Sequence, residues 1–120
     1  MKALAAQLLA QIPGKMSAAW PSGEPFARAF AHGSMSVELY APSGTDTQSP
    51  HLQDELYFIH TGSGQFMMAG ERHVFGPGTA FFVPAGVEHK FEIFSDDFST
   101  WVVFWGPQGG EQVHPVQAPA

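Results

Sequence analysis

The sequence has no cysteine among its 120 residues, which excludes disulfide bonds and thiolate chemistry, whether redox or metal-binding. Basic residues are scarce, since five Lys and Arg stand against eleven Asp and Glu and give a net charge of −6. Nucleic acid is bound through clustered basic side chains, so we do not expect it as a partner. Apolar runs also stay well short of the roughly 20 residues that a membrane span needs. We therefore expect no membrane partner and a cytoplasmic location.

Glycine, proline and phenylalanine are abundant instead, with 13, 10 and 11 residues. Glycine and proline mark turns and aromatic residues favour strands, so the composition predicts one all-β domain. Residues 1–14 predict a short amphipathic helix, because leucines and an isoleucine at helical spacing precede Pro13-Gly14. We expect this helix to pack on a barrel over residues 15–108, with an irregular tail over residues 109–120.

Eight short segments rich in β-branched and aromatic residues predict strands separated by turn signals. They cover residues 26–31, 35–41, 54–60, 65–69, 72–75, 79–83, 87–94 and 100–105. A polar stretch over residues 42–50 predicts a loop between the second and third strands. This number and length of strands suggests a β-sandwich or a jelly roll.

The seventh segment has one apolar and one charged face. Its apolar set, Val87, Phe91 and Ile93, shares its parity with His89 and alternates with three charged residues. His89 should therefore point into the barrel, where an imidazole needs partners for its nitrogens. Two interpretations remain open for it: a core histidine bonded to a backbone carbonyl, or a ligand for a bound group.

A second polar set precedes and enters the third segment. Ser49, His51, Gln53 and Glu55 have the same parity, so an extended backbone would place them on one face. A carboxylate inside a barrel is costly unless a positive charge meets it. Arg28 is one candidate partner for Glu55. A divalent cation would instead explain Glu55 together with His51 and His89.

That candidate site consists of His51, Glu55 and His89. Two imidazoles and one carboxylate are the ligand set of a facial triad, which leaves coordination positions open for substrate or oxygen.

These residues resemble the two motifs of the cupin superfamily. The segment SPHLQDELYFIHTG supplies a motif histidine, its glutamate and, after six intervening residues, a glycine. The segment GTAFFVPAGVEHKFEI supplies Gly, Pro-x-Gly and His at the second motif's offsets. The matched residues are His51, Glu55, Gly62, Gly78, Pro84, Gly86 and His89. The resemblance implies a small single-domain cupin with a jelly-roll β-barrel and a divalent metal ion such as Fe, Mn, Ni or Zn.

The chain departs from the family's pattern at several motif positions, among them Ser49, Thr79, Ile93 and the displaced Gly44. Ser49 stands where the first motif histidine is usual, and Ile93 stands where the second motif ends in asparagine. One of the four usual protein ligands is therefore missing. Gln53, on the expected inward face, is our candidate for the fourth ligand, because its amide oxygen could replace the imidazole.

Two functions of different classes follow from this resemblance. The first is a metal-dependent enzyme of dioxygenase, isomerase or lyase type that acts on a small polar molecule, with Tyr57 assisting proton transfer. The second is a non-catalytic module, with or without a metal, that binds or senses a small ligand.

The last predicted strand contains the stretch Trp101–Trp105, which is apolar on both faces. One face should line the barrel, and the other must be covered. We expect a homodimer to cover it, and the alternative cover is the N-terminal helix.

Overall fold

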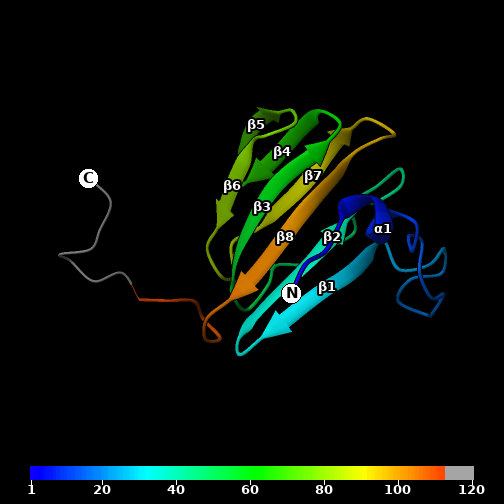
Figure 1. Ribbon diagram of the computed structural model, residues 1–120. Coiled ribbons are helices and arrows are strands. Elements are labelled where there is room, and N and C mark those ends of the chain that lie inside the picture. The colour runs from blue at the N-terminus through cyan, green and yellow to red at the C-terminus, as the bar shows by residue number, and fades with distance from the viewer. Residues whose placement is uncertain (113–120) are drawn as a thin grey trace.

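The structure, a computed structural model, describes residues 1–112, which form one helix and eight strands. Figure 1 shows their arrangement. The helix α1 spans Ala5–Leu9. The strands are β1 Phe26–His32, β2 Met35–Tyr40, β3 Asp54–Thr61, β4 Gly64–Met68, β5 Glu71–Phe75, β6 Ala80–Val83, β7 His89–Phe94 and β8 Ser99–Trp105. The all-β prediction is confirmed, and each predicted strand overlaps an observed one.

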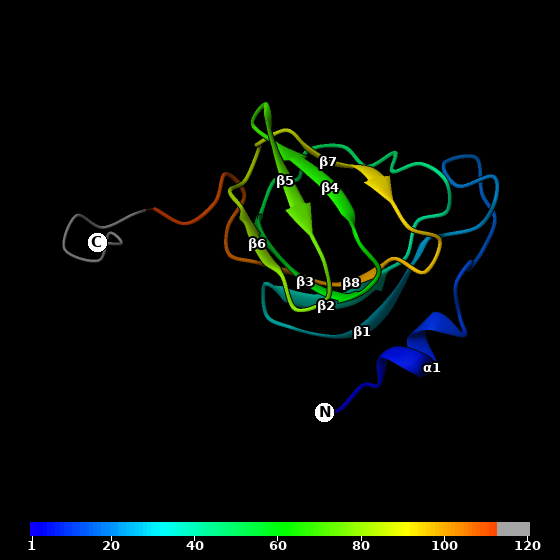
Figure 2. The same cartoon turned by 90° about the horizontal axis from the view of Figure 1, so that it is seen from above.

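Two antiparallel sheets form the domain. The larger has the order β1-β2-β8-β3-β6 and the smaller the order β5-β4-β7. Seen from above in Figure 2, the two sheets face each other across a central space that side chains fill. Tyr57 and Val102 from the larger sheet pack there with Phe66, Phe75 and Phe91 from the smaller one. This is the expected jelly roll, with an aromatic core between its sheets.

The helix α1 is shorter than the 14 residues that the sequence predicts. Leu4 at its N-cap has no side-chain oxygen to satisfy the first backbone N–H groups, and Pro13 lies close behind. Leu8 is buried against Leu39 and Ala27 on the outer face of β1 and β2. The helix therefore packs on the domain as expected and covers one end of the larger sheet. Among the residues that the structure describes, no helix is both long and apolar enough to cross a membrane.

The first residues of the expected tail are held to the domain by hydrogen bonds. Gly109 N–H donates to the Leu52 carbonyl oxygen at 2.8 Å, and Glu111 N–H donates to Asp54 Oδ2 at 2.9 Å. These bonds fasten residues 109–111 beside the start of β3. Residues 113–120 of the predicted tail lie outside the described residues.

The prediction that Ile93 points into the barrel is wrong. The pairing of β4 with β7 shifts between Gln65 and Phe66, so Glu92 is an extra residue between the pairs Gln65–Ile93 and Phe66–Phe91. Such a bulge reverses the alternation of side chains beyond it. His89 and Phe91 keep the buried parity, while Ile93 is 62% exposed.

Candidate metal centre

Three side chains from separate segments converge at one end of the barrel. His51 lies in the loop before β3, Glu55 on the inward face of β3, and His89 at the start of β7. One ligand atom of each lies within 4.8 Å of the other two. The Gly86 N–H donates to the His51 carbonyl oxygen at 2.7 Å, which joins the turn of the second motif to the loop of the first. The structure thus brings together the three residues that the spacing selects.

The carboxylate of Glu55 is buried without a hydrogen-bond partner. Glu55 is 1% exposed, and neither of its carboxyl oxygens makes a hydrogen bond within residues 1–112. In the described part of the chain no Lys or Arg forms an ion pair with it. Arg28 instead lies exposed and pairs in register with Glu38 across β1 and β2. The interpretation of Glu55 as the ion-pair partner of Arg28 is therefore wrong.

His89 combines both interpretations that the sequence left open. Its Nδ1 lies 2.8 Å from the Val87 carbonyl oxygen, so this nitrogen carries the proton in the neutral ring. Its Nε2 has no hydrogen-bond partner among the described residues and lies 3.0 Å from Glu55 Oε1. In the neutral ring two acceptors then face each other in a buried site. A proton or a metal ion between them removes the repulsion, so the donor set fits a divalent cation.

The two histidines differ in electrostatic environment. Burial lowers the pKa of His51, and this outweighs the attraction of Glu55 3.8 Å away. Burial also acts to lower the pKa of His89, but Glu55 and the Val87 carbonyl together raise it above the usual value. His51 is therefore predominantly neutral at pH 7 and able to bind a metal through a free ring nitrogen.

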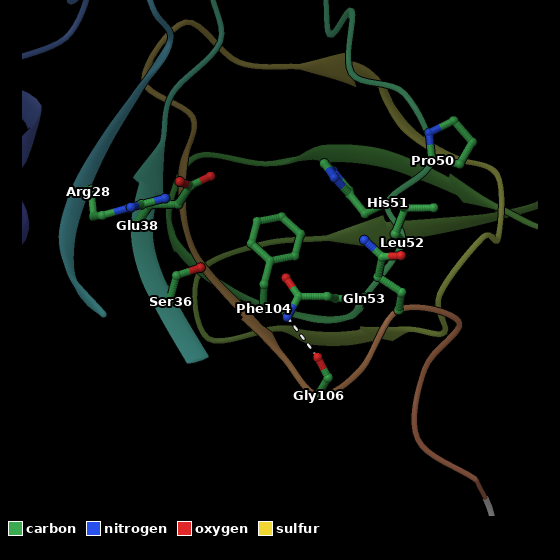
Figure 3. Close-up of a pocket in the computed structure, with 10 residues that line it drawn as sticks. Arg28, Ser36, Glu38, Pro50, His51, Leu52, Gln53, Phe104 and Gly106 are labelled. Atoms are coloured by element: carbon green, nitrogen blue, oxygen red, sulfur yellow. Dashed lines mark hydrogen bonds between the residues drawn. The ribbon is translucent and has the colours of Figure 1, made fainter. Parts of the chain in front are cut away.

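Ser49 and Gln53 do not join the cluster. Ser49 is exposed. Gln53 Nε2 donates to the Ser34 carbonyl oxygen at 3.1 Å and to the Gly106 carbonyl oxygen at 2.9 Å, a bond drawn in Figure 3. The amide of Gln53 thus links the β1–β2 turn to the end of β8 at the cavity mouth. The prediction that these residues share one face is wrong, because the residues before Asp54 form a loop rather than a strand. Period-two alternation therefore does not extend to them.

Gln48 is the site residue that the sequence analysis missed. Its Oε1 lies 3.3 Å from His51 Nε2 and accepts a hydrogen bond from the Tyr57 hydroxyl at 2.9 Å. Parity excludes it from the expected face, because it precedes Ser49 by one residue. Its position in a polar loop next to a motif with a missing histidine was the only available signal.

Tyr57 lies at the site but is poorly suited to proton transfer. It is fully buried, and burial together with the Glu55 carboxylate raises the pKa of its hydroxyl well above the usual value. The phenol therefore stays protonated at neutral pH and acts as a hydrogen-bond donor to Gln48.

A cavity of about 610 Å³ opens beside the cluster, and a second of about 280 Å³ reaches Glu55 itself. The two share Arg28, Glu38, His51 and Phe104 as lining residues, and Figure 3 shows His51 and Phe104 projecting between the strands. Burial raises the pKa of Glu38 to about 7, with Arg28 opposing and Glu55 reinforcing the shift. The cavity wall therefore offers a cation and a carboxyl group that titrates near neutrality.

The comparison with protein families shows to which family the chain belongs. The profile of the family described as Cupin domain matches residues 36–105, more than half of the chain. The chain is a cupin. This cupin is similar to the uncharacterized protein SCO3923 of Streptomyces coelicolor, at 43% identity over 76 residues that cover 62% of this chain and 72% of that protein.

Solved structures share the fold of this cupin. A Cupin 2 conserved barrel domain protein from Salinispora arenicola superposes with a TM-score of 0.58 at 20% identity, covering 68% of this chain and 74% of that one. KdgF from a Halomonas species superposes with a TM-score of 0.61 at 16% identity, covering 69% of this chain and 78% of that one. At these identities the likeness establishes the fold and carries no activity with it.

Proposed function

We propose that this cupin is a small metal-dependent enzyme of dioxygenase, isomerase or lyase type that acts on a small polar molecule. His51, Glu55 and His89 are its metal ligands. The observation that carries the proposal is the pair of buried acceptors, His89 Nε2 and Glu55 Oε1, which face each other at 3.0 Å without a proton donor between them. Burying such groups unpaired costs free energy that a bound cation would recover.

The ligand set leaves coordination positions for a substrate, because three protein ligands do not complete the shell of Fe, Mn, Ni or Zn. A divalent ion held by His51, Glu55 and His89 would supply a Lewis acid for a substrate oxygen or a bound water. The Val87 carbonyl holds the proton on His89 Nδ1 and so directs Nε2 at the site.

Glu38 and Arg28 support an enzyme more than a simple binding module. The Glu38 carboxyl, with a pKa of about 7, can accept or release a proton at neutral pH, which Tyr57 cannot do. Arg28 lines the same cavity and offers a guanidinium to an anionic or polar substrate group. We assign proton transfer to Glu38 in place of Tyr57.

Metal content tests the proposal. Protein purified without chelators or a metal-affinity step should contain close to one iron or manganese per chain by elemental mass spectrometry. Protein that holds no metal and binds no added Mn²⁺ or Fe²⁺ would favour the alternative, a metal-free module that binds or senses a small ligand. The cytoplasmic location and the homodimer stay predictions.

The first prediction concerns the most buried imidazole of the set. His89→Ala should weaken Mn²⁺ binding by more than about 100-fold, because outer-shell substitutions alone cost 10- to 100-fold. Isothermal titration calorimetry measures this, and circular dichroism checks the fold. His60→Ala is the matched control, since His60 is exposed on the outer face of β3. Equal affinity of the two variants would contradict the ligand set.

A further inference from the structure

The loop before the first motif is fastened to the barrel by one buried carboxylate. Asp46 is 2% exposed, and its Oδ1 accepts from the Tyr40 hydroxyl at 2.5 Å and from the Gln48 N–H at 3.1 Å. Its Oδ2 accepts from the Phe91 N–H at 2.9 Å and from Gln48 Nε2 at 2.7 Å. Asp46 thus joins β2, β7 and the loop, and it holds both the backbone and the side chain of Gln48.

These bonds determine which way the amide of Gln48 points. A carboxylate accepts hydrogen bonds, so the group that faces Asp46 Oδ2 must be the NH₂. The carbonyl oxygen Oε1 is then directed at the site, where Tyr57 donates to it at 2.9 Å. An amide oxygen has two lone pairs, and Tyr57 uses one of them. The other is available on the side of His51 Nε2, which lies 3.3 Å from it.

Two of three separations, His89 Nε2 to Glu55 Oε1 and Gln48 Oε1 to His51 Nε2, fit the spacing of atoms bound to one ion, and the third, His51 Nε2 to Glu55 Oε2, is longer. His51 Nε2 lies 3.8 Å from Glu55 Oε2, and His89 Nε2 lies 3.0 Å from Glu55 Oε1. Atoms that bind one ion at about 2.1 Å lie roughly 3 to 3.5 Å apart in octahedral or tetrahedral geometry. The 3.3 Å separation of Gln48 Oε1 from His51 Nε2 falls in that range.

We propose that Gln48 Oε1 is the fourth protein ligand of the metal centre and replaces the imidazole that Ser49 lacks. This inference rests on the proposed metal centre. A neutral amide oxygen in place of an imidazole shifts the set from three nitrogens and one oxygen to two of each. Such a set favours Mn²⁺ and Fe²⁺ more than the usual set does, because oxygen ligands suit Mn²⁺.

The test removes the side-chain amide of Gln48 and, as a control, that of Gln53. Gln48→Leu should weaken Mn²⁺ binding by about 10- to 100-fold in isothermal titration calorimetry. Gln53→Leu is the matched control: it makes the same chemical change at the cavity mouth, and it should bind Mn²⁺ within about twofold of the unmodified protein. Gln48→Asn keeps the amide but withdraws the oxygen by one methylene, and it substitutes for the leucine variant where that variant does not fold.

Spectroscopy separates a ligand from a residue that only orients its neighbours. With Co²⁺ in the site, Gln48→Leu or Gln48→Asn should change the energy and intensity of the visible ligand-field bands. Tyr57→Phe, which removes only the hydrogen bond to Oε1, should leave these bands nearly unchanged. A Gln48 variant that keeps both the Mn²⁺ affinity and the Co²⁺ spectrum of the unmodified protein overturns the inference and leaves the three-ligand centre intact. Failure of the unmodified protein to bind either ion overturns the proposed function instead.

Discussion

At the scale of single residues, the site buries ionisable groups and leaves them without the partners that burial usually requires. Glu55 and His89 are each almost fully buried, and each presents an acceptor to the other. Glu38 shows the same conflict in milder form, since it is half-buried opposite Arg28 without a direct ion pair in the described part of the chain. Both conflicts lie at the cavity, and strongly shifted pKa values are concentrated at functional sites in proteins.

The pKa of Glu38 predicts a pH-dependent cost to stability. Its folded value is raised from 4.5 to about 7, because burial and Glu55 oppose ionisation more than Arg28 favours it. Between these values the folded chain holds more protons than the unfolded chain, so stability falls as pH rises from 4.5 to 7.

Glu38→Gln should therefore raise the melting temperature at pH 8 but not at pH 4.5. Solvent screening of this partly exposed group limits the gain to about 1 kcal/mol. Differential scanning calorimetry at the two pH values measures it. Glu88→Gln, at an exposed position before β7, is the control and should change neither value. A gain that is equal at both pH values would rule out ionisation as the cause.

At the scale of elements, the β4–β7 pair shows how one glycine permits a bulge. An added Cβ at Gly64 would lie 1.9 Å from the Ile93 carbonyl oxygen, which belongs to the backbone and cannot move away cheaply. Gly64 therefore allows the two strands to approach where Glu92 bulges from the ladder.

Gly64→Ala should lower the free energy of unfolding by about 3 kcal/mol, the upper end for overpacking. Urea denaturation followed by tryptophan fluorescence measures this change. Gly76→Ala makes the same change where an added Cβ meets nothing within 4 Å, so it should be neutral or slightly stabilising. If the two variants have equal free energies of unfolding, the close approach at Gly64 does not affect stability.

At the scale of the whole molecule, the outer face of the larger sheet is only partly covered. The helix α1 packs over Leu39 and the neighbouring edge of Trp101. Phe58 and Phe82 remain 46% and 48% exposed, and the Phe82 ring lies 6.1 Å from that of Trp105. The helix, which the sequence analysis treated as an alternative to a partner chain, thus covers one part of this face and leaves the rest exposed.

We predict that the remaining apolar surface is the homodimer interface. Phe82→Glu should convert the dimer to a monomer in size-exclusion chromatography with light scattering, because it places a charge among Phe58 and Trp105. Val74→Glu is the control, since Val74 is 80% exposed on the smaller sheet. A protein that is monomeric before any substitution would refute the predicted dimer.

The strands and three of the site residues could be predicted because their signals are local. Turn residues delimit each strand, and period-two alternation places Glu55 and His89 on inward faces whichever strands pair. Motif spacing supplies His51. The alternation also indicates the outward position of Lys90, which the structure shows as exposed.

The rest depends on contacts between segments that are distant in sequence. Ile93 turns outward because β4 pairs with a bulge in β7, and the pattern within β7 does not reveal its partner's register. The choice of Gln48 over Gln53 or Ser49 is made by Asp46, which binds Gln48 only where the loop, β2 and β7 meet. A loop has no periodicity from which a side chain's direction follows. The sequence by itself therefore determined the strands and the three side chains that converge, whereas tertiary hydrogen bonds decided which neighbouring amide faces them.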